Sequence, residues 1–140
     1  MPETIPAKKI YFLLLIGGLI VAATFVVGLV FGVSTWEAWW VSNFFHFLGG
    51  MYAFFFVRAV FYYTRPYHKI TAASWAEVFL FVAGALILGV LWEWFEFVLD
   101  RYRVIIAAKP SLMTYADNIG DLIIDTLGAF VAAYIYGRKK

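Results

Sequence analysis

Residues 117–136 read DNIGDLIIDTLGAFVAAYIY, an apolar stretch that contains three aspartates. Asp117, Asp121 and Asp125 recur at every fourth residue, so in a helix of 3.6 residues per turn their carboxylates would lie along one stripe. The apolar residues that follow, Leu127 to Tyr136, are enough to carry this helix through a bilayer. Carboxylates inside a transmembrane segment are costly and are usually functional. The stretch therefore predicts a membrane-spanning helix that carries a polar site.

The composition of the whole chain is that of a membrane protein. Of its 140 residues, 64% are apolar and 14% are charged, against roughly 45–50% and about 25% in a soluble domain. The mean hydropathy is +0.84. The chain has no cysteine, which excludes disulfides and thiolate metal ligands. Length and composition together predict one all-α domain over residues 1–140.

The apolar residues fall in four blocks, and each block is long enough for a transmembrane helix. The first has no charge and would be about 34 Å long as a helix, enough to cross a hydrocarbon core of about 30 Å. It is longer than the apolar core of a signal peptide, so we expect it to be retained. We predict a compact four-helix bundle with spans at 11–33, 41–63, 75–99 and 117–136. Polar connections are expected at 34–42, 64–75 and 100–116.

Lysine and arginine are distributed unevenly between the two sides of the predicted bundle. One side holds both termini and the second connection, with eight such residues: Lys8, Lys9, Arg58, Arg65, Lys69, Arg138, Lys139 and Lys140. The other side has three: Arg101, Arg103 and Lys109. Because basic residues favour the cytoplasmic side, both termini are predicted to be cytoplasmic. The protein would then be a multi-pass protein of the cytoplasmic (inner) membrane.

This topology brings ionisable residues of three spans to a similar depth. His46 lies early on the second span, and Glu93 and Glu96 lie late on the third, where their spacing of three places them on one helix face. The aspartates of the fourth span descend from the same surface. One imidazole and five carboxylates are thus predicted to converge in the outer half of the bundle: His46, Glu93, Glu96, Asp117, Asp121 and Asp125.

Five carboxylates cannot all remain charged in a low-dielectric region, because burying each one costs several kcal/mol even after relaxation. Three arrangements would relieve this charge: a bound divalent cation, protons shared between carboxylates, or pairing with Arg101, Arg103 and Lys109. An oxygen-rich set with one imidazole suits Mg²⁺, Mn²⁺, Ca²⁺ or Zn²⁺. The same three basic residues are also candidates for binding an anionic lipid head group.

Each candidate also has an ordinary structural interpretation. Asp117 would be the N-cap of the last helix. Glu93 or Glu96 would pair with an arginine of the following connection, and His46 would be a hydrogen-bonded histidine of the bundle. Asp121 and Asp125 are hardest to explain in this way, because they lie one and two turns inside the span.

The same residues carry a resemblance to known families. His46-Phe47, Glu93-x-x-Glu96-Phe97 and Gly120-Asp121-x-x-x-Asp125-x-x-Gly128 resemble the pattern of the VanZ-like small membrane proteins, and more closely that of the YjdF-type bacterial inner-membrane family. VanZ-like proteins tend to have Gln in place of Glu96 and Asn in place of Asp125. The resemblance covers roughly residues 40–135 and implies an inner-membrane protein with this polar site, without a defined reaction.

Three classes of function fit these observations. The first is a membrane-embedded enzyme or lipid-modifying protein in which a carboxylate-bound metal activates water or a phosphate. The second is a proton- or cation-coupled transporter subunit, and the third is a non-catalytic membrane scaffold. We expect the partners to be the lipid bilayer, a lipid or cell-envelope ligand and a second copy of the chain, with no nucleic acid.

Single cysteines at residues 34, 71, 111 and 137 test the predicted orientation, because the chain has no cysteine of its own. With an impermeant thiol reagent on intact cells, we expect labelling of Ser34→Cys and Ser111→Cys. Thr71→Cys and Gly137→Cys should be labelled only after permeabilisation. The reverse pattern would contradict cytoplasmic termini.

Overall fold

The computed structural model describes residues 6–31, 36–64, 74–106, 108 and 114–137. These residues form four α-helices: α1 (Ala7–Phe31), α2 (Trp36–Thr64), α3 (Ser74–Ile106) and α4 (Tyr115–Gly137). Each helix contains a segment that is long and apolar enough to cross a membrane. The predictions of an all-α fold and of four membrane-spanning helices are confirmed.

Two helix boundaries differ from the predicted spans by more than four residues. α2 begins at Trp36, inside the segment expected to be a connection. α3 continues to Ile106, so Arg101 and Arg103 belong to a helix and the prediction that they lie in a loop was wrong. Charged residues do not end a helix by themselves, and no glycine or proline interrupts the sequence here. Lys109 lies outside the described residues.

The start of α4 is capped by Thr114. Its hydroxyl oxygen accepts a hydrogen bond from the backbone N–H of Asp117 at 3.1 Å, and its carbonyl accepts one from the N–H of Asn118 at 3.2 Å. These contacts satisfy backbone donors that have no partner within the first turn. The cap is therefore Thr114 and not Asp117, which lies within the first turn.

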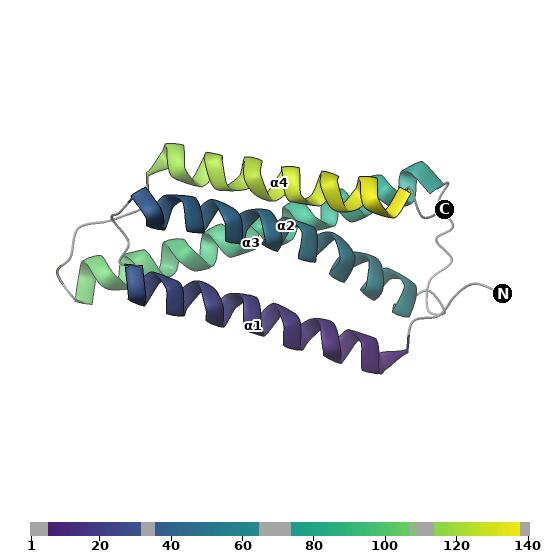
Figure 1. Ribbon diagram of the computed structural model, residues 1–140, viewed down its shortest axis with the longest axis horizontal. Helices are drawn as coiled ribbons and strands as arrows, with labels where there is room; N and C mark the ends of the chain where they lie inside the picture. Colours follow the sequence, from purple (N-terminus) through teal and green to yellow (C-terminus); the bar gives the residue numbers. More distant parts are fainter. Residues whose placement is uncertain (1–5, 32–35, 65–73, 107, 109–113, 138–140) are drawn as a thin grey trace.

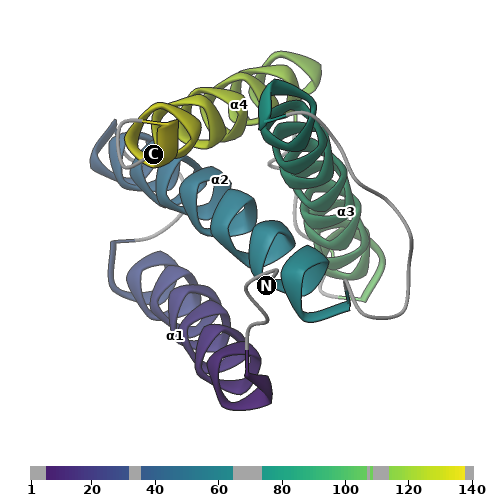
Figure 2. The same ribbon diagram turned by 90° about the vertical axis from the view of Figure 1, so that its right-hand side faces the viewer.

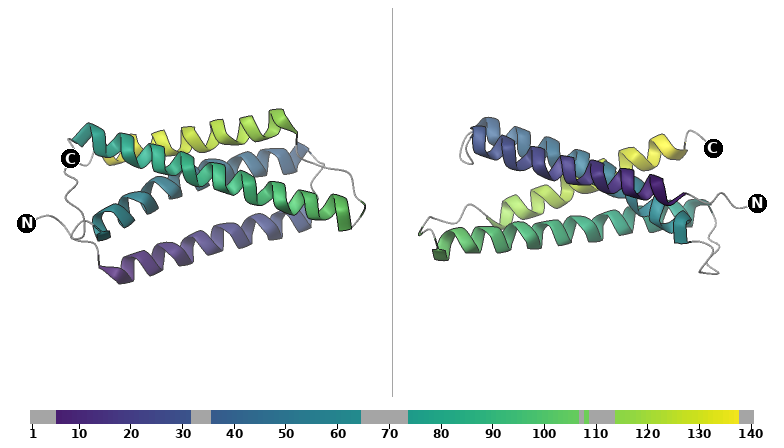
Figure 3. Two further views of the ribbon diagram at one scale, coloured as in Figure 1. Left: turned by 180° about the vertical axis from the view of Figure 1, so that it is seen from behind. Right: turned by 90° about the horizontal axis from the view of Figure 1, so that it is seen from below.

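α2 is the central helix of the bundle. It packs against each of the other three, and α3 also packs against α4 (Figures 1 and 2). Among the four described helices, α1 contacts α2 alone. The beginning of α1 and the end of α4 lie at the same end of the molecule in both views of Figure 3, as an even number of antiparallel spans requires.

The buried core lies where α2, α3 and α4 meet. Phe54 and Phe81 are fully buried and contact each other edge to face, with ring centroids 5.8 Å apart. α4 contributes small side chains, including Ala129 and Ala132. Small residues let helix backbones approach closely, and van der Waals packing is a main source of helix association inside a bilayer.

α2 and α4 come into backbone contact at two glycines. A Cβ atom on Gly50 would overlap the carbonyl group of Asp125, and one on Gly128 would overlap the carbonyl of Phe47. Neither neighbour is a flexible side chain that can move aside. Glycine is therefore required at both positions for the helices to cross at this distance.

Gly50→Ala and Gly128→Ala are each expected to destabilise the folded protein. Overpacking costs about 1–3 kcal/mol, more than the roughly 1 kcal/mol that alanine gains over glycine in a helix. The measurement is a melting curve in detergent, where both variants should melt several degrees below the unmodified protein. Gly120→Ala is the matched control on α4, because nothing lies within 4 Å of a Cβ at that position. Equal melting temperatures for Gly120→Ala and Gly128→Ala would contradict the close crossing.

Candidate metal centre

His46 lies at the centre of the polar cluster. It is on α2, one turn before Gly50, and only 6% of its surface is exposed. The close crossing of α2 and α4 therefore places its imidazole beside the first half of α4. The carboxylates around it come from α3 and α4.

Each nitrogen of the imidazole faces one carboxylate from α3 and one from α4. Nδ1 lies 3.9 Å from Glu93 Oε1 and 3.5 Å from Asp125 Oδ1. Nε2 lies 4.0 Å from Glu96 Oε2 and 3.6 Å from Asp121 Oδ2. All four distances exceed the usual hydrogen-bond range of about 2.7–3.2 Å. The groups surround the imidazole without closing tightly on it.

The cluster carries a surplus of negative charge. With every carboxylate ionised, its four carboxylates and one imidazole sum to −3, and this sum already counts the imidazole as protonated. The ion pairs described for Glu93 and Glu96 are with His46. Arg101 instead places its guanidinium 5.2 Å from the ring of Phe97, one turn away on its own helix. The surplus must be relieved by protons on some of the carboxylates or by another source of positive charge.

Glu93 is the least satisfied member of the cluster. Its residue is 5% exposed, and neither of its carboxylate oxygens has a hydrogen-bond partner among the described residues. A carboxyl group that shared a proton with a neighbour would make an O–H···O contact of about 2.5–3.0 Å. The arrangement around Glu93 is thus suited to a ligand that accepts carboxylate oxygens, such as a metal ion.

Four of these residues offer ligand atoms at a spacing close to that of a metal site. One nitrogen or oxygen from each of His46, Glu93, Glu96 and Asp121 lies within 4.8 Å of the other three. Two ligands of one ion are separated by at most twice the metal–ligand distance, which is about 4.2 Å for Mg²⁺ and up to about 5.2 Å for Ca²⁺. Small side-chain shifts would bring the group to the spacing of any of the four predicted ions.

The sequence-predicted candidates divide into three groups. His46, Glu93, Glu96, Asp121 and Asp125 are brought together. Asp117 is exposed at the first turn of α4, outside the four-residue group. Of the three basic candidates, Arg101 is exposed on α3, and neither the Arg103 side chain nor Lys109 is described.

Sequence reasoning missed Gly89, which lies beneath the cluster. A Cβ at this position would be 2.8 Å from Asp125 Oδ2, so the absence of a side chain on α3 makes room for that carboxylate. In the sequence, Gly89 could have been found from its position one turn before Glu93 on the same helix.

A second polar group lies at the opposite end of α2. Tyr62 donates a hydrogen bond to Glu77 at 2.9 Å, and the Arg58 guanidinium lies 4.5 Å from the ring of Tyr136. Glu77 is buried and paired with the tyrosine, which satisfies its charge within the bundle.

The chain belongs to the family described as "Predicted membrane protein (DUF2238)", whose model matches residues 6–140. This description agrees with the four apolar helices and identifies a multi-pass membrane protein. No curated protein and no solved structure matches the chain. The VanZ-like and YjdF-type names are not part of the family's description, and they remain a resemblance.

The surplus charge predicts an unusual response to a neutralising substitution. Without divalent cations, Glu93→Gln should leave the melting temperature unchanged or raise it by a few degrees, because it removes one uncompensated buried charge. Asp117→Asn, which neutralises an exposed carboxylate, serves as the control and should have little effect. The measurement is a melting curve in detergent with chelator present. A large loss of stability in Glu93→Gln would mean that its charge is already paired.

Proposed function

We propose that this protein binds a divalent cation between α2, α3 and α4, and that its function depends on this cation. His46, Glu93, Glu96 and Asp121 would be its ligands. The observation that carries the proposal is the buried Glu93 carboxylate, whose two oxygens have no hydrogen-bond partner among the described residues. A carboxylate in that position is costly unless a cation satisfies it.

Asp125 would orient the imidazole and not bind the ion. It lies closer to Nδ1 than any other carboxylate does, at 3.5 Å. A histidine ligand commonly donates one ring N–H to a carboxylate and binds the metal through its other nitrogen. In this arrangement Nε2 faces the ion, on the side where Glu96 and Asp121 lie. Glu93, whose Oε1 is 3.9 Å from Nδ1, would reach the same ion through a shift of its side chain.

The donor set narrows the chemistry of the ion. Three carboxylates and one imidazole suit Mn²⁺ or Zn²⁺, which accept both kinds of ligand, and Mg²⁺ or Ca²⁺ would rely mainly on the oxygens. An imidazole that binds a metal is neutral, so a divalent ion would reduce the charge of the four carboxylates from −4 to −2. Bound there, it would supply Lewis acidity toward a polar group that reaches the cluster from the membrane.

The position of the cluster in the membrane follows from the predicted orientation. With both termini in the cytoplasm of a bacterium, the ends of α1 and α3 and the beginnings of α2 and α4 lie at the outer face of the inner membrane. The cluster would then act on a lipid or cell-envelope ligand in the outer leaflet. The excess of lysine and arginine on the side that holds both termini supports this placement, because basic residues favour the cytoplasmic side.

Cation binding is tested by melting curves in detergent with Mg²⁺, Mn²⁺, Ca²⁺ or Zn²⁺ against chelator. An ion at about 100 times its dissociation constant adds about 2.7 kcal/mol to the folded state, which corresponds to a rise of roughly 5–10 °C in a protein of this size. We expect Asp121→Asn to abolish the rise. Asp125→Asn should weaken ion binding about 10- to 100-fold, as expected for a residue that orients a ligand.

Asp117→Asn is the matched control for both variants, because it makes the same substitution at an exposed position of α4. It should keep the full cation-dependent rise. The proposal fails if none of the four ions raises the melting temperature of the unmodified protein. An equal response in Asp121→Asn would remove that residue from the site.

A further inference from the structure

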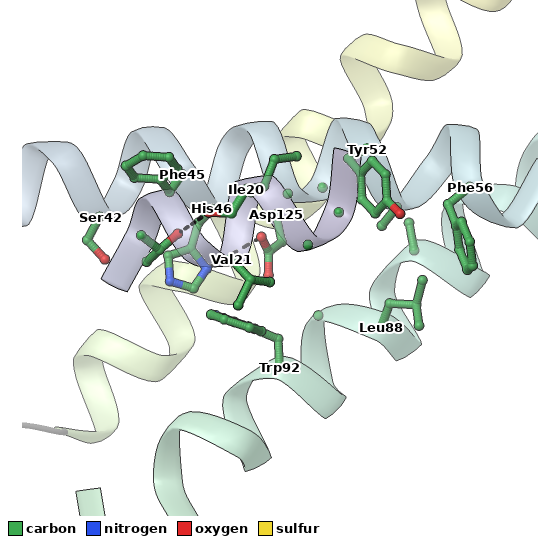
Figure 4. Close-up of a pocket in the computed structure, with 18 of the residues that line it drawn as sticks. Ile20, Val21, Ser42, Phe45, His46, Tyr52, Phe56, Leu88, Trp92 and Asp125 are labelled. Atoms are coloured by element: carbon green, nitrogen blue, oxygen red, sulfur yellow. Dashed lines mark hydrogen bonds and ion pairs between the residues drawn. The ribbon is translucent and has the colours of Figure 1, made fainter. Parts of the chain in front are cut away.

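A cavity of about 340 Å³ lies between α1, α2 and α3, directly beside the polar cluster (Figure 4). His46 and Asp125 point toward each other on its wall, between Ser42 on one side and Tyr52 on the other. Most of the remaining wall is apolar, including Val21 of α1, Phe56 of α2 and Leu88 of α3. His46 is the proposed cation ligand that lines the cavity, so the cavity reaches the edge of the proposed cation site.

The cavity exists because side chains are missing from its walls. Five of the residues that line it are glycines: Gly17, Gly18, Gly49, Gly50 and Gly89. Two of these are needed for close helix packing, since Gly17 lies against the ring of Tyr52 and Gly50 against the backbone of α4. Gly18 has no such neighbour, because nothing lies within 4 Å of a Cβ built there. At Gly18 the missing side chain leaves space and no packing contact.

The polar groups of the lining are not spread evenly over it. The hydroxyl of Tyr52 donates to the carbonyl of Leu13 at 2.8 Å, and that of Thr24 donates to the carbonyl of Ile20 at 3.0 Å. Both are therefore engaged with backbone groups of α1. Ser42, His46 and Asp125 lie together in the part of the cavity away from Tyr52 and Phe56, where they can meet an occupant. The occupant should be apolar over most of its length and polar at one end.

The dimensions of the cavity match one chain of a membrane lipid. On α1 its wall runs from Leu14 to Thr24, a rise of about 15 Å, which is half of a hydrocarbon core of about 30 Å. α1 is at the membrane-facing side of the bundle and none of its spanning window is buried. Water avoids apolar cavities of this kind, and the medium around the helices is lipid.

We propose that this cavity binds a single-chain membrane lipid, with its alkyl chain between α1 and α3 and a hydroxyl-bearing head group at His46 and Asp125. The head group must donate hydrogen bonds, because the cluster presents a surplus of carboxylate oxygens. The position of the head group rests on the proposed cation site, which it would share. The position of the chain rests on the cavity alone.

The probe is a monoacylglycerol whose acyl chain carries a diazirine. After photolysis with the protein in nanodiscs, the labelled residues are identified by mass spectrometry. We expect saturable labelling of Val21, Leu88 and Trp92, which an excess of unlabelled monoacylglycerol prevents. Ile87, which is 63% exposed on α3, should be labelled without saturation by lipids that merely surround the protein.

Gly18→Phe is designed to narrow the cavity from an exposed position of its lining, without disturbing the backbone. It should reduce the saturable labelling about tenfold and leave both the labelling of Ile87 and the cation-dependent rise in melting temperature unchanged. The matched control is Gly137→Phe at the end of α4, where a Cβ also meets nothing within 4 Å. If Gly18→Phe does not fold, Leu88→Trp fills the same cavity from α3.

The outcomes separate the two proposals. Labelling of Leu88 and Trp92 that does not saturate, or that persists in both filled variants, overturns the lipid site. Saturable labelling that is lost on filling supports the chain site even where chelator has no effect on it or on the melting temperature. In that case the cation site alone is wrong.

Discussion

The contact between α2 and α4 at Gly50 and Gly128 determines both the fold and the site. No side chain separates the helices there, so their backbones touch. His46 lies one turn before the first glycine, and Asp125 lies just before the second. The same contact therefore sets the distance between the imidazole and the carboxylates of α4. Within a bilayer there is little hydrophobic drive between helices, so packing of this kind both holds the bundle together and fixes the geometry of the cluster.

The buried charged groups at the two ends of the bundle differ in whether they have interaction partners. At the end of the bundle that holds both termini, Glu77 accepts a hydrogen bond from Tyr62, and Arg58 lies over aromatic rings. At the other end, Glu93 is buried without a hydrogen-bond partner among the described residues. Phe54 and Phe81, both fully buried, lie between the two groups. This apolar layer argues against a continuous polar path through the described helices, and it favours a binding site over conduction.

The sequence predicted the features of the fold and site that depend on local sequence pattern. Apolar block length located the four helices, and the spacing of Asp121 and Asp125 placed them on one face beside His46. It did not predict the cap at Thr114 or the continuation of α3 to Ile106, because charged residues were taken as the mark of a loop. The cavity could not be predicted from the sequence either. Its walls include glycines on three helices, and only the packing of the helices brings these glycines together.

α1 has a different role from the other helices. All members of the polar cluster lie on α2, α3 and α4, and among the described helices α1 contacts only α2. Its contribution near the site is a wall of the cavity, where Gly17 lies against Tyr52 and Gly18 leaves open space. Three helices can therefore assemble the cluster, and the fourth forms a wall of the cavity beside it. In the proposed lipid site, the width of the space beside Gly18 would determine which membrane molecules reach His46 and Asp125. Selectivity for a ligand and affinity for a cation would then depend on different residues.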